Sequence, residues 1–160
     1  MKEEIKAEIK KERKEKKEKK QLSRGARNIG YIVSIAVNII LIYIFNNLLN
    51  WHINFINESF ISPLWVLNIS FAAIILANIF YLIYDGMWFR SLCQVILNII
   101  SAAAIYTLYI VFPFNLDEPA AGNIRFVLIV FLVGIGIAII VELIKFIYYF
   151  VRFITGSDER

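Results

Sequence analysis

After its first 28 residues, the chain alternates long apolar stretches with short polar segments. The apolar stretches cover about residues 29–49, 63–84, 91–112 and 124–150. An α-helix rises ~1.5 Å per residue, so about 20 residues cross the ~30 Å hydrocarbon core of a bilayer. Each stretch is long enough for one crossing, and the pattern therefore predicts four transmembrane helices.

The third stretch carries a seam of polar side chains at helical spacing. Gln94, Asn98 and Ser101 follow Ser91 along one side of this otherwise apolar helix. Such side chains hydrogen-bond across membrane helices for about 0.6 kcal/mol each on average. The alternative to this favoured adhesive role is a hydrated path or a small polar ligand site between helices. With asparagines on the neighbouring spans, the candidate polar seam consists of Asn38, Asn78, Gln94, Asn98 and Ser101.

The segment between the second and third stretches is very short and begins with Asp85 and Gly86. A connection of this length makes its two flanking helices antiparallel neighbours. We expect Gly86 to adopt the left-handed conformation that closes a tight turn. The predicted fold class is all-α: an integral membrane four-helix bundle with a charged, partly helical N-terminal arm in the cytoplasm.

Composition supports lipid as the solvent of this bundle. The chain is 59% hydrophobic, against about 45–50% in soluble domains. A soluble chain of 160 residues buries only about 70% of its surface and could not hide so much apolar side chain. We therefore expect hydrocarbon, not water, to meet most of the protein surface.

The N-terminal arm, residues 1–27, is dominated by charge. It contains twelve Lys or Arg and six Glu, a net charge of +6. We expect a solvated, partly helical arm that loosens near Ser23, Gly25 and Gly30. It could lie on anionic lipid head groups, where each cation is worth about 1 kcal/mol, bind a protein partner, or only set topology. Nucleic acid is an unlikely partner because no aromatic side chains interleave with the basic ones.

The distribution of the other cations predicts the topology. Arg90, Lys145, Arg152 and Arg160 all fall on the same side as the arm, whereas Arg125 is alone at the opposite surface. Positive charge in short segments favours the cytoplasmic side. We expect a multi-pass protein of the cell membrane with both termini in the cytoplasm and a short tail, residues 151–160.

A set of charged residues is expected near the cytoplasmic ends of the spans. It comprises Asp85, Arg90, Glu142 and Lys145. Two acids and two bases can pair and hold helix ends together. Alternatively, Glu142 could couple to protons or cations, because ionisable groups within a membrane are functional candidates by default.

Other chemistry is not indicated. The one histidine, His52, lies with Trp51 and Glu58 in a loop and has no cysteine nearby, so no zinc site is expected. We find no catalytic, metal or cofactor motif, and predict a protein that is not an enzyme. Gly134 and Ala138 form a small-xxx-small pair, which allows close helix packing inside the bundle or in a homo-oligomer.

The run Tyr84-Asp85-Gly86-Met87-Trp88-Phe89-Arg90-Ser91-Leu92, with the later Val111-Phe112-Pro113-Phe114, resembles a pattern in a family of small four-span prokaryotic membrane proteins of unknown function. In that family the turn has aspartate, proline and a basic residue before Trp-Phe-Arg, whereas this chain has Gly86 and Met87. The resemblance covers about residues 28–150. It implies four spans in a prokaryotic cell membrane and implies no activity, ligand or partner.

Two functions stay open. The favoured one is an accessory or structural membrane protein that keeps its basic arm near anionic lipid or a partner. The alternative is a small channel or transporter that uses the polar seam around Asn98 and Glu142.

Overall fold

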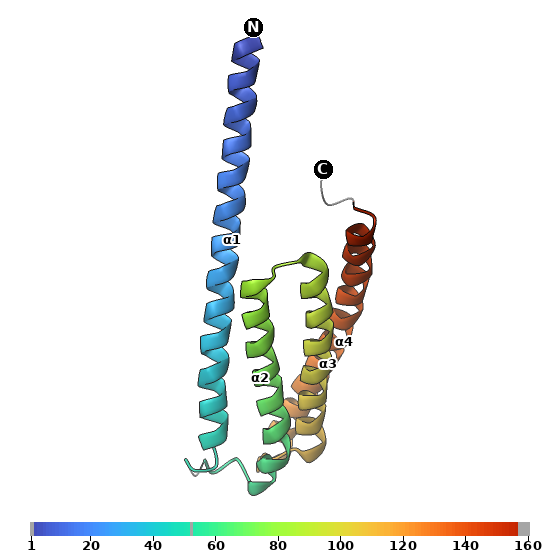
Figure 1. Cartoon of the computed structure of the whole chain (residues 1–160). Helices are drawn as coiled ribbons and strands as arrows, with labels where there is room; N and C mark the ends of the chain where they lie inside the picture. Colours follow the sequence, from blue (N-terminus) through green and yellow to red (C-terminus); the bar gives the residue numbers. More distant parts are fainter. Residues whose placement is uncertain (1, 52, 157–160) are drawn as a thin grey trace.

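The computed structural model describes residues 2–51 and 53–156, and of residues 2–22 it describes the backbone alone. Its helices are α1 (Lys2–Asn47), the 3₁₀ helix η1 (Glu58–Phe60), α2 (Ile61–Ile83), α3 (Met87–Val111) and α4 (Glu118–Ile154). The predicted fold class is confirmed: the protein is all-α, with four long helices packed as a bundle. Figure 1 shows these helices running alongside one another, with the N-terminus and the end of α4 at the same end of the bundle.

The helices pack as an open row. α1 packs on α2, α2 on α3 and α3 on α4, and in the described part of the chain the backbones of non-consecutive long helices do not come close to each other. α1 and α4 therefore form the two flanks of the row. This order follows from the short connections, which hold each helix beside the next one in sequence.

All four long helices are apolar enough to cross a membrane. The apolar spans are Ser23–Asn47, Glu58–Ile83, Met87–Val111 and Glu118–Ile154. Large apolar side chains remain on the surface of the flanking helices: Ile29 is 65% exposed and Phe126 is 68% exposed. A water-soluble protein rarely leaves so much contiguous apolar surface uncovered. By helix length and hydropathy, the chain is a multi-pass membrane protein in contact with the lipid bilayer.

The expectation that the arm loosens near Ser23, Gly25 and Gly30 is wrong. α1 continues as one helix of 46 residues through all three positions. A glycine inside a helix costs only about 1 kcal/mol, and the apolar packing of α1 on α2 begins just beyond. Arg27 also braces this segment, because its Nη1 donates a hydrogen bond to the Ser23 hydroxyl at 2.8 Å.

The end of the bundle opposite the arm is closed by loop pairing and apolar packing. The backbone N–H of Asn57 donates to the backbone carbonyl of Pro113 at 3.0 Å. This bond joins the α1–α2 connection to the α3–α4 connection. Phe60 beneath these loops is 2% exposed and shares a core cluster with Leu67 and Ala104. We call this end of the bundle the closed end.

The other end contains the α2–α3 turn, and we call it the turn end. Gly86 in this turn is extended, with φ −72° and ψ 134°, so the expected left-handed conformation is wrong. The absence of a side chain at Gly86 instead leaves room for the Tyr84 ring, because a Cβ at Gly86 would lie 2.6 Å from a ring atom of Tyr84. The glycine is needed there because the tyrosine ring folds back over the turn.

Candidate functional site

Asp85, in the α2–α3 turn, is the centre of a polar network at the turn end. Arg27 Nε donates to Asp85 Oδ2 at 2.8 Å, and the Tyr31 hydroxyl donates to Oδ1 at 2.8 Å. Arg90 Nε lies 3.2 Å from the same Oδ1, and Arg90 Nη1 donates to the Tyr31 hydroxyl at 3.1 Å. Residues from α1, from the turn and from α3 thus meet at one carboxylate.

The electrostatics of this network favour the ionised aspartate. Partial burial raises the pKa of the Asp85 carboxyl. The hydrogen bonds from Tyr31 and Arg27, together with the charges of Arg90 and Arg27, lower this pKa by a larger amount. The net pKa lies below its usual value. The Asp85 side chain is only 8% exposed, whereas Arg27 and Arg90 are 38% and 32% exposed. Asp85 therefore works as a fixed counter-ion for two arginines that partly face solvent.

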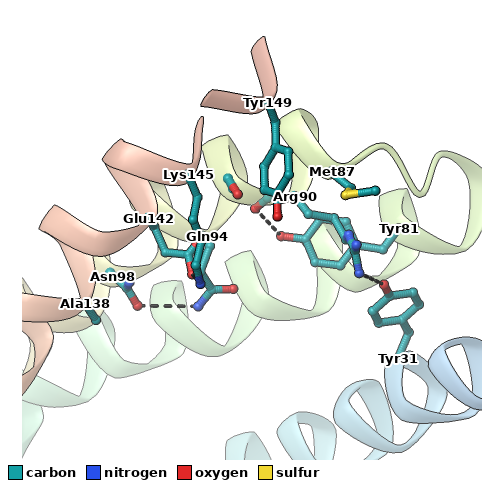
Figure 2. A pocket seen from close by; sticks show the side chains of 11 residues that line it. Tyr31, Tyr81, Met87, Arg90, Gln94, Asn98, Ala138, Glu142, Lys145 and Tyr149 are labelled. Carbon is teal, nitrogen blue, oxygen red and sulfur yellow. Dashed lines mark hydrogen bonds and ion pairs between the residues drawn. The ribbon is translucent and has the colours of Figure 1, made fainter. Parts of the chain in front are cut away.

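Next to this network lies a pocket of about 480 Å³. Figure 2 shows side chains from all four helices around it, and most of them come from α3 and α4. α1 and α2 contribute Tyr31 and Tyr81; α3 contributes Met87, Arg90, Ser91, Gln94 and Asn98; α4 contributes Ala138, Glu142, Lys145 and Tyr149. The lining is divided about evenly between polar and apolar surface, and this volume is within the range of ligand pockets.

The pocket brings part of the polar seam together with part of the charge set. Gln94 Nε2 donates to Asn98 Oδ1 at 3.4 Å along α3. Across from them, Lys145 Nζ lies 2.7 Å from Glu142 Oε1 on α4. Ser101 lies one turn beyond Asn98, is half-buried, and is outside the pocket lining.

The remaining seam residues, Asn38 and Asn78, belong to a different place. Asn78 Nδ2 donates to the Ser34 hydroxyl at 3.1 Å and to the Ile74 carbonyl at 2.7 Å. Asn38 Nδ2 donates to the Ser34 carbonyl at 2.8 Å. Both asparagines are 7% exposed. Asn78 joins α2 to α1, whereas Asn38 bonds within α1, so only Gln94 and Asn98 of the five seam residues line the pocket.

Arg27 and Tyr31 are site residues that the sequence reasoning missed. Arg27 stands at the end of a run of cations, so nothing in its neighbourhood distinguishes it. The available signal was spacing: Arg27 and Tyr31 are four residues apart, so they lie on one helix face. Tyr81 was also missed as a lining residue; its hydroxyl donates to the Arg90 carbonyl at 3.4 Å.

The other sequence candidates lie away from the pocket or contribute little to it. Trp51 is exposed and Glu58 begins η1, while His52 lies outside the described residues. Gly134 has open space around its Cα, with no atom within 4 Å of an ideal Cβ. Gly134 therefore makes no close helix contact within the described chain.

Comparison of the chain with protein-family models, with curated proteins and with solved structures gives no match. The family resemblance of the α2–α3 turn accordingly stays a resemblance. What stands is the class that the helices themselves define: a multi-pass membrane protein with four spans.

Proposed function

We propose that this protein is a non-enzymatic accessory protein of the cell membrane, whose bundle holds a basic helical arm at the cytoplasmic face. One observation carries the proposal: α1 runs without a break from Lys2 to Asn47. The first apolar span and the charged arm are therefore one helix. A continuous helix holds the arm, and any molecule bound to it, in a fixed orientation relative to the bundle.

The base of the arm is tied to the bundle. Arg27 Nη2 lies 2.8 Å from Asp85 Oδ2, so the point where the arm leaves the first span is joined to the α2–α3 turn. Figure 1 shows α1 continuing well past this turn. The 21 residues from 2 to 22 would add about 32 Å at a helical rise. An arm of that reach is suited to a partner beyond the head groups as well as to anionic lipid at its base.

The arm is tested by removing residues 2–22 from protein held in phosphatidylcholine nanodiscs and measuring co-flotation with added vesicles of phosphatidylglycerol and phosphatidylcholine. A matched control keeps the full length but replaces the lysines of residues 2–22 with glutamine. We expect both variants to insert as the full chain does and to lose binding to the anionic vesicles or to a crosslinked partner. Equal binding by the truncated form would reject the proposal, as would labelling that places the two termini on opposite sides of the membrane.

A small channel or transporter is the second candidate, favoured by the placement of Gln94, Asn98 and Glu142 around one pocket. A path through the protein would also have to pass the closed end, where Phe60 and Ala104 are each 2% exposed. Liposome flux assays test this candidate. Flux that is lost in Asn98→Leu and in Glu142→Gln would support transport, and absence of flux in the wild-type protein would count against it.

A further inference from the structure

The pocket at the turn end borders an apolar groove along α4. Ala138 lines both cavities. The groove has a volume of about 380 Å³ and runs from Phe126 past Gly134 to Ala138, with almost no polar surface. Gly134 leaves room in it because no side chain projects there. A polar compartment and an apolar one thus meet at a single residue.

Charge is not balanced around the polar compartment. Arg27 and Arg90 share one carboxylate, that of Asp85, whereas Lys145 and Glu142 form a one-to-one pair. The five groups leave a surplus of one positive charge. Arg90 and Lys145 both line the pocket, and a bound group with one negative charge, such as a phosphodiester, would neutralise the set.

The polar groups are also graded along the helix axis. Going from the turn end into α3, Arg90 is followed one turn deeper by Gln94 and another turn deeper by Asn98, so that about 12 Å separates the first from the last. In a phospholipid the phosphate is outermost, the ester carbonyls lie below it and the acyl chains lie deepest. Charged, amide and apolar surfaces follow each other in the same order here, and Figure 2 shows Gln94 and Asn98 facing Glu142 and Lys145.

Aromatic side chains mark this level as the membrane interface. The Trp88 ring packs in tilted geometry against Phe150 at 5.9 Å and against Phe153 at 5.6 Å between ring centroids. Tryptophan and tyrosine are enriched at the head-group level of membranes, and Tyr149 lines the same pocket. The cations of the pocket therefore lie at the depth at which lipid phosphates are found.

We propose that the pocket and the α4 groove together bind one anionic phospholipid. Its phosphodiester lies between Arg90 and Lys145, its ester carbonyls accept hydrogen bonds from Gln94 and Asn98, and an acyl chain runs along Gly134. The site uses no residue before Tyr31 as a ligand, so it is separate from the arm, and either proposal can fail without the other. A soluble phosphate ester is also anionic but has no acyl chain to occupy the apolar groove.

Native mass spectrometry of the full chain in mild detergent tests this site, with phosphatidylglycerol and phosphatidylcholine of identical acyl chains as probes. We expect one retained phosphatidylglycerol and weaker retention of phosphatidylcholine. Lys145→Gln removes a cation from a side chain that is 48% exposed, and should reduce retention about fivefold. Arg24→Gln, which removes an exposed cation outside the pocket, should leave it unchanged.

The groove is tested separately by Gly134→Leu, which fills it without changing charge. We expect a similar loss of phosphatidylglycerol, and Lys145→Arg should retain the lipid. Equal retention of the two lipids, or equal effects of Lys145→Gln and Arg24→Gln, would overturn the proposal. Displacement of the lipid by soluble glycerol phosphate would also overturn it. So would a Gly134→Leu variant that changes only dimer formation, because that result would assign the groove to a second copy of the chain. If Gly134→Leu does not fold, the Lys145 and Arg24 variants decide the matter.

Discussion

Removing the charge of Asp85 should destabilise the bundle measurably. Asp85→Asn keeps the size of the side chain, but it leaves Arg27 and Arg90 close together without their shared counter-ion. Asp85 is 8% exposed and accepts its hydrogen bonds from Arg27 and Tyr31 at 2.8 Å each. An asparagine could still accept from Tyr31, so the principal loss is the pairing with the two arginines.

The magnitude follows from the exposure of the partners. A hydrogen bond to a charged group contributes about 1.5–3 kcal/mol, and breaking a fully buried ion pair costs about 3–5 kcal/mol. Arg27 and Arg90 are 38% and 32% exposed, so solvent screens part of the repulsion that the substitution leaves. We expect a loss of about 2 kcal/mol in the free energy of unfolding. For a chain of this size that corresponds to a decrease in Tm of roughly 4–8 °C.

The assay is thermal unfolding of the purified protein in one detergent, followed by tryptophan fluorescence and by size-exclusion recovery. Asp117→Asn is the matched control, because Asp117 precedes α4, is exposed and makes no side-chain cap hydrogen bond. It should change stability by less than about 0.5 kcal/mol. Combining Asp85→Asn with Arg27→Gln should cost less than the sum of the two single changes, because the residues are in contact. A Tm for Asp85→Asn within about 1 °C of wild type would refute the reasoning.

Further predictions concern pH and the glycines. Because the pKa of Asp85 is lower in the folded protein, its stabilising contribution is fully present above its unfolded pKa of about 3.9 and is lost as the pH falls below that value. Wild-type Tm should therefore decline below about pH 4 more steeply than that of Asp85→Asn, and parallel curves would contradict this. Gly86→Ala should lower Tm, since its Cβ would meet the Tyr84 ring at 2.6 Å. Gly134→Ala, which meets nothing within 4 Å, should raise helix stability by about 0.5–1 kcal/mol; the opposite order of the two glycine variants in a melting experiment would refute both.

The number of spans could be predicted because the bilayer imposes it. A crossing helix needs about 20 apolar residues, and this requirement is visible in the sequence without knowledge of any contact. The short α2–α3 connection likewise requires neighbouring helices. The clustering of Asp85 with Arg90 could be expected for the same reason, since both lie within one turn of the connection.

What the sequence could not provide is the rotation of each helix about its axis. Asn38 and Asn78 have the same side chain as Asn98, yet Asn38 bonds within α1, Asn78 bonds from α2 to α1, and Asn98 lines the pocket. Spacing shows which residues share a face, but it does not show which neighbour that face meets. Gly86 was misjudged for a related reason. Its conformation is ordinary, and the constraint comes from a Tyr84 ring whose position depends on the folded turn.

The two ends of the bundle differ in a way that bears on both proposed functions. Along α3, the polar side chains Gln94 and Asn98 occupy the half near the turn end, whereas Ala104, in the other half, is 2% exposed and packs into the Phe60 cluster. The polar pocket thus lies in the half of the bundle near the turn end. A transporter with this structure would need a second conformation that separates Phe60 from Ala104. An accessory protein that binds a lipid and holds a basic arm on the same side needs only the arrangement described here.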